Sequence, residues 1–383
     1  MQKIAEIIII GGGIIGTSIA YYLAQKRAQD VILLEKGMLG EGSTGKCAGG
    51  IRLQFSTEIN IAFSLASMEV WNHFQEITEV DIGFKKVGYL FLATTNEEWA
   101  IFQANVKMQR QFGIPVELLS PEEIAYRWPF LKVDDLAGGT FCLLEGYAGP
   151  YEALSAFARG ARMGGVKIYE GTEVVEIKPE KGKFYSLKTN KGDFRSRLVV
   201  MATGPYAAKT GELVGLKIPV LPYRRQIFFT APFPWLPESV PLTIDFHRGW
   251  YFRREGRGLL LSGPKDDFSS FNMQIDYEAM AITAENSIRR VPVMEKAQIV
   301  RGWAGLYEIS PDHHAILGEA PSLPGFFLAN GFSGHGFQHS PAVGKVMAEL
   351  LLQERPSIDV STLSLERFAK GELIQEPLTA FKE

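Results

Sequence analysis

The residues with the clearest chemical meaning lie within the first 35 positions. Gly11, Gly13 and Gly16 form a Gly-x-Gly-x-x-Gly pattern, and Glu35 follows 19 positions after Gly16. Glycines at this spacing let backbone amides approach a pyrophosphate, the next helix N-terminus stabilises its negative charge, and the acidic side chain accepts hydrogen bonds from ribose hydroxyls. The pattern predicts a dinucleotide site. An acidic residue at position 35 favours an unphosphorylated ribose, so the candidate cofactors are FAD and NAD rather than NADP.

A glycine-rich loop follows Glu35 directly. Between positions 37 and 50 it contains six glycines together with Ser43 and Thr44. Its length is unusual for an NAD dehydrogenase, where a new helix usually starts sooner. Long loops of this kind are either functional or simply irregular, so a surface loop without a ligand is the alternative interpretation.

Other reactive side chains indicate no second type of site. His335 and His339 are four positions apart, but glycines surround them and Pro341 follows, so neither a helix nor a metal site is predicted there. No Ser-His-Asp or Cys-His arrangement can be read from the sequence. Of the two cysteines, Cys47 in the glycine-rich loop is the one candidate for a reactive thiol, and Cys142 suits a packing role.

Composition and charge exclude several classes of function. The 383 residues include 40 Lys and Arg against 43 Asp and Glu, a net charge of −3, which provides no electrostatic footprint for nucleic acid or an anionic membrane. Two cysteines fit a reducing compartment, and no uninterrupted apolar stretch approaches the ~20 residues of a membrane span. We therefore expect a cytoplasmic small-molecule enzyme without a transmembrane segment, and a peripheral membrane contact stays open.

The elements that must position these residues begin with a strand–helix–strand unit. A β-branched run at residues 7–10 predicts a strand buried on both faces, apolar residues at helical spacing predict a helix over 15–23, and residues 31–34 predict a second strand. Ser120 and Pro121 are placed to start another helix. Further helices are predicted at 61–74, 151–163, 279–290 and 344–352, and further strands at 87–93, 166–170, 173–178, 186–189 and 198–202.

Strand–helix–strand units at the start and middle of the chain, with β-rich stretches between them, indicate an α/β fold of two interleaved domains. One is a Rossmann-like cofactor domain with a doubly wound sheet. The other is an antiparallel β-sheet substrate domain. We assign residues 1–84, 145–218 and 300–383 to the cofactor domain, and 85–144 and 219–299 to the substrate domain.

Four sets of segments, in the same order along the chain, resemble the D-amino-acid oxidase-like FAD oxidoreductases. This family contains sarcosine oxidase, glycine oxidase and the dye-linked proline dehydrogenases. Within it the chain is most similar to the β subunits of heteromeric dye-linked L-proline dehydrogenase and heterotetrameric sarcosine oxidase. The last segment is the most discriminating, because Gly-Phe-Ser-Gly-His-Gly-Phe is long and chemically unusual. The four sets are 10–16 with 34–36; 42–44 with 50–52; 202–204; and 303–305, 310–312 and 331–337.

The resemblance implies a Rossmann-like FAD-binding domain that holds FAD non-covalently. The cysteine that attaches flavin in monomeric sarcosine oxidase aligns with Gly305 here. The implied cofactor-binding residues are Gly11, Gly13, Ile14, Ile15, Gly16, Glu35, Lys36, Ser43, Thr44, Gly49, Gly50, Ile51, Val174, Ala202, Thr203, Gly204, Gly331, Gly334, His335, Gly336, Phe337 and Gln338.

Three residues are assigned to catalysis through the same resemblance. Arg52 would bind the substrate carboxylate, since the planar guanidinium suits bidentate binding. Tyr251 would cover or hydrogen-bond the substrate, and His335 belongs to the segment that meets the flavin in the family. The alternatives are a surface arginine at position 52 and simple core packing for two of the three consecutive aromatic residues at 250–252.

Departures from the family refine the expected reaction. Tyr307 stands where glycine oxidase and D-amino-acid oxidase have an arginine, and Gln338 where monomeric sarcosine oxidase has a lysine. The segment 258–262 lacks the lysine that helps oxygen react, which favours a dehydrogenase over an oxidase. Arg225 stands where the proline dehydrogenase β subunit has a histidine, which puts proline itself in doubt.

We therefore expect an FAD-dependent dehydrogenase that oxidises the C–N bond of an amino acid, with a secondary amine such as L-proline or sarcosine favoured, by hydride transfer to flavin N5. Electrons would pass to a second, different subunit or a dye, and the relatives add the expectation of FMN at a subunit interface. The alternatives are an oxygen-using sarcosine, glycine or D-amino-acid oxidase that produces hydrogen peroxide, and a non-catalytic FAD-containing assembly subunit.

Overall fold

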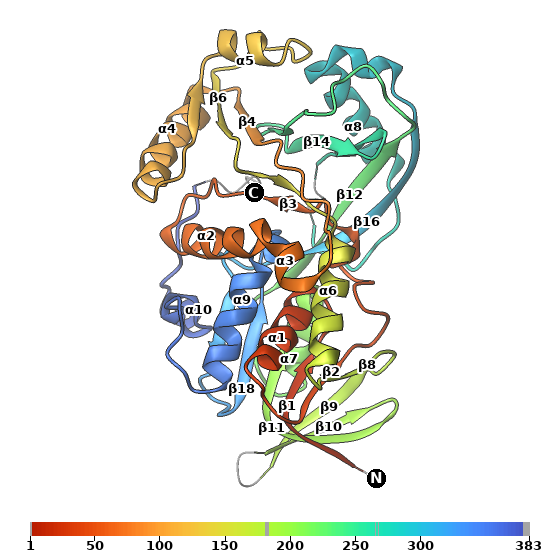
Figure 1. Ribbon diagram of the computed structural model, residues 1–383, viewed down its shortest axis with the longest axis vertical. Coiled ribbons are helices and arrows are strands. Elements are labelled where there is room, and N and C mark those ends of the chain that lie inside the picture. Colours follow the sequence, from red (N-terminus) through yellow and green to blue (C-terminus); the bar gives the residue numbers. More distant parts are fainter. Residues whose placement is uncertain (1, 181–183, 265, 267, 378–383) are drawn as a thin grey trace.

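The structure is a computed structural model that describes residues 2–180, 184–264, 266 and 268–377. Two large sheets organise it, one near each end of the long axis, as Figure 1 shows. In the part of the chain that the structure describes, no helix combines the length and apolar character needed to cross a lipid bilayer.

The first sheet is built around a buried parallel core. β1 pairs in parallel with β11 and β2, β2 with β8, and β11 with β18. β17 pairs with β18, and β10 with β9 and β11, all antiparallel. The strands are β1 (Lys3–Ile10), β2 (Val31–Leu34), β8 (Lys167–Tyr169), β9 (Val174–Glu180), β10 (Phe184–Thr189), β11 (Gly192–Met201), β17 (Ile316–Glu319) and β18 (Phe326–Asn330).

Alternation along β1 explains why this sheet is covered on both faces. Ile7 and Ile9 belong to one hydrophobic cluster, and Ile8 and Ile10 belong to another on the opposite face. Successive side chains of a strand point to opposite faces, so a continuous isoleucine run needs apolar partners on both sides. The strand buried on both faces that the sequence predicts is confirmed.

Helices pack on the first of these faces. α1 contacts α9 and α6, and α9 contacts α2, and Figure 1 shows α1, α6 and α9 close together with α2 above them. The helices of the chain are α1 (Ile14–Gln25), α2 (Glu58–Asn72), α3 (Phe74–Thr78), α4 (Asn96–Gln111), α5 (Pro121–Arg127), α6 (Pro150–Met163), α7 (Ala207–Glu212), α8 (Tyr277–Arg290), α9 (Gly336–Leu351) and α10 (Glu366–Lys370).

The second sheet is mainly antiparallel, and one of its pairs, β4 with β13, is parallel. Trp250 and Phe252 are fully buried in its core, while Tyr251 between them lines a cavity. In sheet order its strands are β16 (Ile299–Ile309), β12 (Leu221–Thr230), β15 (Gly258–Ser262), β14 (Trp250–Glu255), β13 (Leu242–Asp245), β4 (Tyr89–Ala93), β6 (Gly138–Cys142) and β5 (Glu117–Leu119).

Short elements join the two parts. β3 (Gly50–Ile51) pairs with β7 (Gly146–Tyr147), and the long strand β16 pairs with β12 along almost its whole length. Residues 300–309, which we assigned to the cofactor domain, therefore hydrogen-bond within the second sheet. The domain boundaries as such stay a prediction.

Candidate functional site

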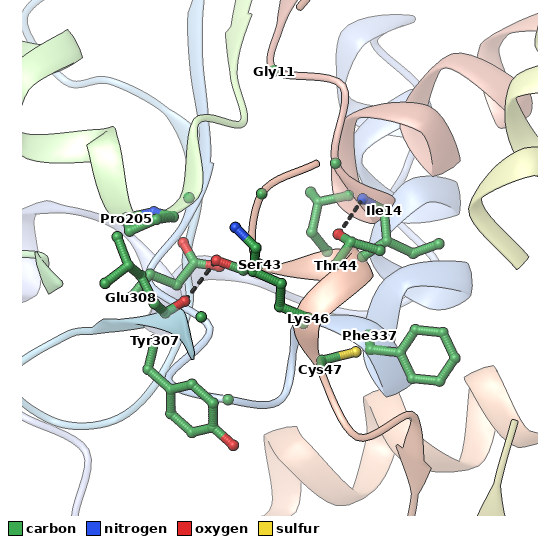
Figure 2. Close-up of a pocket in the computed structure, with 18 of the residues that line it drawn as sticks. Gly11, Ile14, Ser43, Thr44, Lys46, Cys47, Pro205, Tyr307, Glu308 and Phe337 are labelled. Atoms are coloured by element: carbon green, nitrogen blue, oxygen red, sulfur yellow. Dashed lines mark hydrogen bonds between the residues drawn. The ribbon is translucent and has the colours of Figure 1, made fainter. Parts of the chain in front are cut away.

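A single cavity of about 1040 Å³ extends from the glycine turn after β1 to the inner face of the second sheet. Small-molecule sites usually measure about 300–1,000 Å³, so this one has room for a large cofactor and a substrate together. Figure 2 shows Gly11 and Ile14 on one side and Tyr307 on the other, with Ser43, Thr44 and Lys46 between them.

The glycine turn owes its shape to two close backbone approaches. Gly11 has a φ of +111°, and a Cβ atom there would overlap the carbonyl oxygen of Ala202. A Cβ on Gly16 would overlap the carbonyl oxygen of Gly11. Larger residues at these positions would push α1 away from β1, so glycine is required for the turn to close.

The N-terminus of α1 opens onto this cavity. Gly13 provides no side-chain cap, and the first turn contains no acidic residue. Thr44 Oγ1 accepts a hydrogen bond from the Ile14 N–H at 3.0 Å. Because N-terminal amides and the helix dipole favour anions, this end of the helix fits the pyrophosphate of a dinucleotide.

Glu35 lies beside the turn, at the end of β2. Its carboxylate accepts hydrogen bonds from the backbone N–H groups of Gly12 at 2.6 Å and Gly37 at 2.8 Å, and it lines the cavity. The neighbouring Lys36 places Nζ 3.1 Å from the centroid of the Tyr206 ring. The predicted acidic group is therefore on the cavity wall, at the place where the motif requires it.

The glycine-rich loop folds across the cavity. Ser43 and Thr44 point in opposite directions, as Figure 2 shows. Thr44 contacts the start of α1, and Ser43 Oγ donates to the carbonyl oxygen of Leu306 on β16 at 2.6 Å. The two short side chains thus join the loop to the start of α1 and to β16 of the second sheet, and the loop forms part of the cavity wall.

The end of β11 is secured from the neighbouring strand. Asn330, at the end of β18, accepts from the Thr203 N–H at 2.9 Å and donates to the carbonyl oxygen of Met201 at 2.6 Å. Ala202, Thr203 and Gly204 all line the cavity. The amide of Asn330 therefore substitutes for a backbone partner where the chain leaves the sheet.

One sequence prediction about this region was wrong. α9 begins at Gly336, eight residues before the predicted start, and Pro341 lies inside it. Proline removes the N–H that would bond the carbonyl oxygen of Phe337. The Ser340 hydroxyl donates to that oxygen instead, at 2.8 Å, so the helix tolerates the proline. Its N-terminus, with no acidic residue in the first turn, also faces the cavity.

Most predicted cofactor residues line this one cavity, and three do not: Gly16, Ile51 and Gly331. Gly16 acts through the close approach to Gly11, while Ile51 is 2% exposed and Gly331 has a φ of +74° at the end of β18. The predicted residues that line the cavity are Gly11, Gly13, Ile14, Ile15, Glu35, Lys36, Ser43, Thr44, Gly49, Gly50, Val174, Ala202, Thr203, Gly204, Gly334, His335, Gly336, Phe337 and Gln338.

Arg52 reaches the cavity from the residue after β3. One guanidinium nitrogen donates to the carbonyl oxygen of Gln54, and another lies 3.3 Å from Nε2 of His335. The guanidinium carbon is 3.7 Å from the centroid of the Phe55 ring. Burial lowers the pKa of Arg52 from its ordinary value, but an arginine stays charged near neutral pH. A partly buried cation of this kind suits a carboxylate ligand.

Glu145 holds the segment that carries Arg52. This fully buried carboxylate accepts from the backbone N–H groups of Leu53 at 2.5 Å and Gln54 at 2.8 Å, and from the Gln54 side chain at 2.7 Å. Burial raises the pKa of Glu145 to about 7, against the opposing effect of these hydrogen bonds and of Arg52. Sequence reasoning missed this residue, because nothing local distinguishes it from any other glutamate in a turn.

His335 is held as a neutral imidazole. Burial and the positive charge of Arg52 keep the pKa of His335 well below its usual range. Its Nε2 faces the guanidinium of Arg52, an arrangement in which the histidine accepts a hydrogen bond. Burial likewise lowers the pKa of His339 to about 3, and its Nε2 lies 2.8 Å from Ser64 Oγ. Among the described residues, no cluster of three or more His, Cys, Asp or Glu side chains is arranged to hold a metal ion.

Three tyrosines and a second arginine line the cavity together with Arg52. Tyr89, Tyr251 and Tyr307 line it together with Arg225 of β12. Burial raises the pKa of each phenol, so all three remain hydrogen-bond donors. Of the four, Tyr251 was predicted as a site residue from its resemblance to the family's active-site strand; Tyr307 and Arg225 were noted only as departures, and Tyr89 was missed.

Two carboxylates on the cavity wall were also missed. Glu308 accepts from the Gly331 N–H at 2.8 Å, and removal of water raises the pKa of Glu308 to about 7. Glu376 lies near Arg52, whose charge it supports. Burial also raises the pKa of the Cys47 thiol to about 11, so this thiol is protonated near neutral pH and is a weak nucleophile.

These residues fit a flavin dinucleotide. Two helix N-termini without acidic first-turn residues face one cavity, and glycines leave room where the backbone must come close. The sequence matches the family described as DAO, FAD dependent oxidoreductase, over residues 6–350. The chain therefore belongs to this family of FAD-dependent oxidoreductases, which confirms the predicted family, the two-sheet α/β fold and FAD as the cofactor.

Three of the proteins that are similar to this chain are named for an amino acid. It is 30% identical to rat dimethylglycine dehydrogenase over 96% of this chain, but spans only 45% of that longer protein. It is also 30% identical to glycine oxidase from Geobacillus kaustophilus, over 94% of this chain and 97% of the oxidase. The crystal structure of L-proline dehydrogenase from P. horikoshii is 34% identical, with a TM-score of 0.91, and covers 98% of this chain and 100% of its own.

Proposed function

We propose that the protein is an FAD-dependent dehydrogenase that oxidises the C–N bond of an amino acid, with secondary amines preferred. The observation that carries this proposal is the position of Arg52, a partly buried cation in the same cavity as the dinucleotide turn. A carboxylate-binding group in the same cavity as the turn suits a substrate with a carboxylate close to the carbon that loses hydride. The similarity to glycine oxidase and L-proline dehydrogenase supports the same class of substrate.

The residues of the chain divide the work between binding and positioning. Arg52 binds the carboxylate, and Glu145 and neutral His335 position Arg52. Tyr251 and Tyr307, both protonated, cover the substrate and donate hydrogen bonds. When bound, FAD supplies the acceptor for the hydride that leaves the substrate carbon. The oxidised substrate is an imine, which water then hydrolyses.

The residues of β15, which include no lysine, favour a dehydrogenase over an oxidase. β15 contributes only Gly, Leu and Ser residues, and Ser262 Oγ donates to the carbonyl oxygen of Gln226. Among the described residues that line the cavity, the lysines are Lys36, Lys46 and Lys209, none of them on β15. We therefore propose that electrons leave to a second, different subunit or a dye. FMN at a subunit interface and a cytoplasmic location remain predictions.

Anaerobic reduction of the bound flavin tests the proposal directly. The yellow holoprotein is mixed in turn with three secondary amines, which are sarcosine, L-proline and N-methylalanine, and with the primary amines glycine and alanine. The flavin absorption is followed after each addition. The secondary amines should bleach it. If no amino acid of the panel does so, the catalytic proposal fails and a non-catalytic assembly role gains support.

The similarity to glycine oxidase favours one second candidate, an oxidase that uses oxygen. Oxygen consumption and hydrogen peroxide formation, measured with the amino acid that bleaches the flavin fastest, separate the two. Slow oxygen uptake together with rapid reduction of an artificial dye supports the dehydrogenase. Rapid peroxide formation without any dye would replace it with the oxidase.

A further inference from the structure

Another, much smaller cavity lies beside the segment that carries Arg52. It measures about 10 Å³, and three amide side chains line it, Gln54 from that segment and Asn105 and Gln109 from α4. The other lining residues are apolar apart from Thr140. No lining residue is more than 7% exposed, so the cavity is buried.

Each of these three amides has a buried atom without a hydrogen-bond partner in the part of the chain that the structure describes. The atoms are Oε1 of Gln54, Oε1 of Gln109 and Nδ2 of Asn105. The nitrogens of the two glutamines are already engaged, because Gln54 donates to Glu145 at 2.7 Å and Gln109 to the carbonyl oxygen of Phe55 at 2.8 Å. Buried polar atoms of native proteins nearly always have a partner, either in the protein or in ordered water.

One water molecule matches this set of atoms. A water donates through two hydrogens and accepts through its oxygen, so it can donate to both glutamine oxygens and accept from the Asn105 N–H. A cavity of about 10 Å³ is close to the smallest that holds one water, and a buried water makes about three hydrogen bonds. A metal cation would meet the Asn105 N–H, and an anion would meet two oxygens, so a neutral molecule of this size fits better than either.

Both glutamines lead to the residues around Arg52. Gln54 shares the Glu145 carboxylate with the backbone N–H groups that this carboxylate holds in the same segment. Gln109 holds the carbonyl oxygen of Phe55, and the Phe55 ring lies 3.7 Å from the guanidinium carbon of Arg52. A molecule that links the two glutamines would therefore hold residues 54 and 55 from the side of α4, opposite in role to Glu145.

We propose that a buried water bound by Gln54, Asn105 and Gln109 joins α4 to the segment that carries Arg52, and that Asn105 and Gln109 are positioning residues for this arginine. The water site stands on the cavity and its three polar atoms alone. The effect on Arg52 rests on the proposed function, in which Arg52 binds the substrate carboxylate. Because α4 packs against β4 and β6, the water ties the proposed substrate end to the second sheet.

A high-resolution crystal structure of the holoprotein tests the water site directly. It should show one water about 2.7–3.2 Å from each of the three atoms. Asn105→Leu, which fills the cavity with apolar atoms, should show none. The water site is overturned if the unchanged protein has no density between these side chains, or if the amides bond to one another instead.

Binding of (methylthio)acetate, a carboxylate ligand with no C–N bond to oxidise, measures the effect on Arg52. The change in the flavin spectrum gives its dissociation constant. Asn105→Leu should weaken binding about fivefold at unchanged flavin content, because one lost hydrogen bond shifts an equilibrium by that much. Gln103→Leu is the matched control, since Gln103 is an exposed residue of α4, and it should stay within about twofold. Asn105→Ala serves the same purpose if the leucine variant does not fold.

Two double variants separate positioning from a general loss of stability. Added to Gln109→Leu, Asn105→Leu should weaken binding little further, because both substitutions remove the same water. Added to Arg52→Met, it should change the affinity by less than about twofold, because no arginine is left to position. A full fivefold effect in the Arg52→Met background would overturn the positioning role.

Failure of this inference and failure of the proposed function have different signatures. If Arg52→Met weakens the ligand and Asn105→Leu does not, the positioning role fails and the proposed function stands. If the unchanged protein does not bind the ligand, or Arg52→Met binds it equally well, the proposed role of Arg52 fails together with its positioning by α4. The electron density still decides whether the water is bound.

Discussion

The two ends of the cavity offer different kinds of groups to the cofactor and to the proposed substrate. At the dinucleotide end the groups offered to the cofactor are mostly backbone amides, in the turn between Gly11 and Gly16 and at the N-termini of α1 and α9. At the substrate end the groups that face the cavity are side chains. Arg52, Arg225 and Tyr307 come from three strands or strand ends that are far apart in the sequence. A site made by close backbone approaches excludes larger residues at Gly11 and Gly16, whereas a site made by side chains can change its ligand preference one residue at a time.

This difference predicts which properties a substitution at each end of the cavity will change. Changes at the dinucleotide end should cost the fold and the cofactor together, because the same close approaches serve both. Changes at the substrate end should alter ligand affinity and leave the flavin in place. The expected effects below run from the largest to the smallest, and each one tests this separation.

Gly16→Ala should have the largest effect. The new Cβ would overlap the Gly11 carbonyl oxygen, so we expect a loss of about 3 kcal/mol in the free energy of unfolding, together with loss of bound flavin. Alanine is otherwise the better helix residue by about 1 kcal/mol, so any destabilisation measures the clash. Denaturant unfolding and the ratio of flavin to protein absorption provide the measurements.

Gly42→Ala is the control for stability in the adjoining loop, since a Cβ there meets open space. Its free energy of unfolding should stay within about 0.5 kcal/mol of the unchanged protein. If Gly16→Ala retained its flavin and unfolded like Gly42→Ala, the dinucleotide end would not depend on backbone contact as described.

Arg52→Met should separate the two ends most clearly. Loss of a partly buried charge partner should raise the KM for amino acids about 100-fold, while flavin content stays unchanged. Steady-state kinetics with a dye as electron acceptor, and the flavin spectrum, measure the two quantities. Arg52→Lys should recover part of the affinity through its charge. An unchanged KM would remove Arg52 from the carboxylate site.

Glu145→Ala tests how the substrate end is positioned. It would leave the buried N–H groups of Leu53 and Gln54 without their acceptor, so we expect a loss of about 2 kcal/mol in the free energy of unfolding and a higher KM. Glu145→Gln, which retains an acceptor oxygen, should restore most of both. Equal effects of the two substitutions on KM, with kcat unchanged, would contradict a positioning role.

The same residue should make stability depend on pH. Burial raises the pKa of Glu145 from 4.5 to about 7, so the stability present at low pH is lost as the pH rises from about 4.5 through about 7. Each unit of pKa difference corresponds to about 1.4 kcal/mol. Burial raises the pKa of Glu308 to about 7 as well, so both carboxyl groups contribute to the slope. Thermal unfolding of the holoprotein between pH 4.5 and 8 should show it, and Glu145→Gln should reduce it by about half. An unchanged slope in the variant would assign the pH dependence to other groups.

Ser340→Ala should have the smallest effect of the set. It would leave the carbonyl oxygen of Phe337 without the hydroxyl that replaces the missing N–H of Pro341, at a cost of about 1 kcal/mol in the free energy of unfolding. Flavin affinity should fall slightly, because α9 begins at the cavity. Ser239→Ala, on an exposed serine, is the control and should be neutral. No difference between them would mean that Pro341 needs no substitute donor.

The sequence predictions were accurate where the signals are local, and they failed where three-dimensional contacts decide the structure. The strand–helix–strand opening, the glycine turn and Glu35 could be read directly, because period, glycine spacing and an acidic residue are local signals. The start of α9 was misplaced by eight residues, because proline is disfavoured inside a helix and favoured near its start, and the compensating hydroxyl of Ser340 is visible only in three dimensions. Glu145 carried no local signal at all.

The sequence by itself predicted a dinucleotide-binding turn that requires glycine, because the glycine spacing and the strand and helix that flank it are local signals. Resemblance added the flavin and Arg52. Only the tertiary structure decided which distant side chains meet around the substrate end. Strand pairing between β12 and β16 places Arg225 and Tyr307 on one face, and the alternation of a strand turns Arg224 to the other. Such register between distant segments is set by packing, which no single stretch of sequence records.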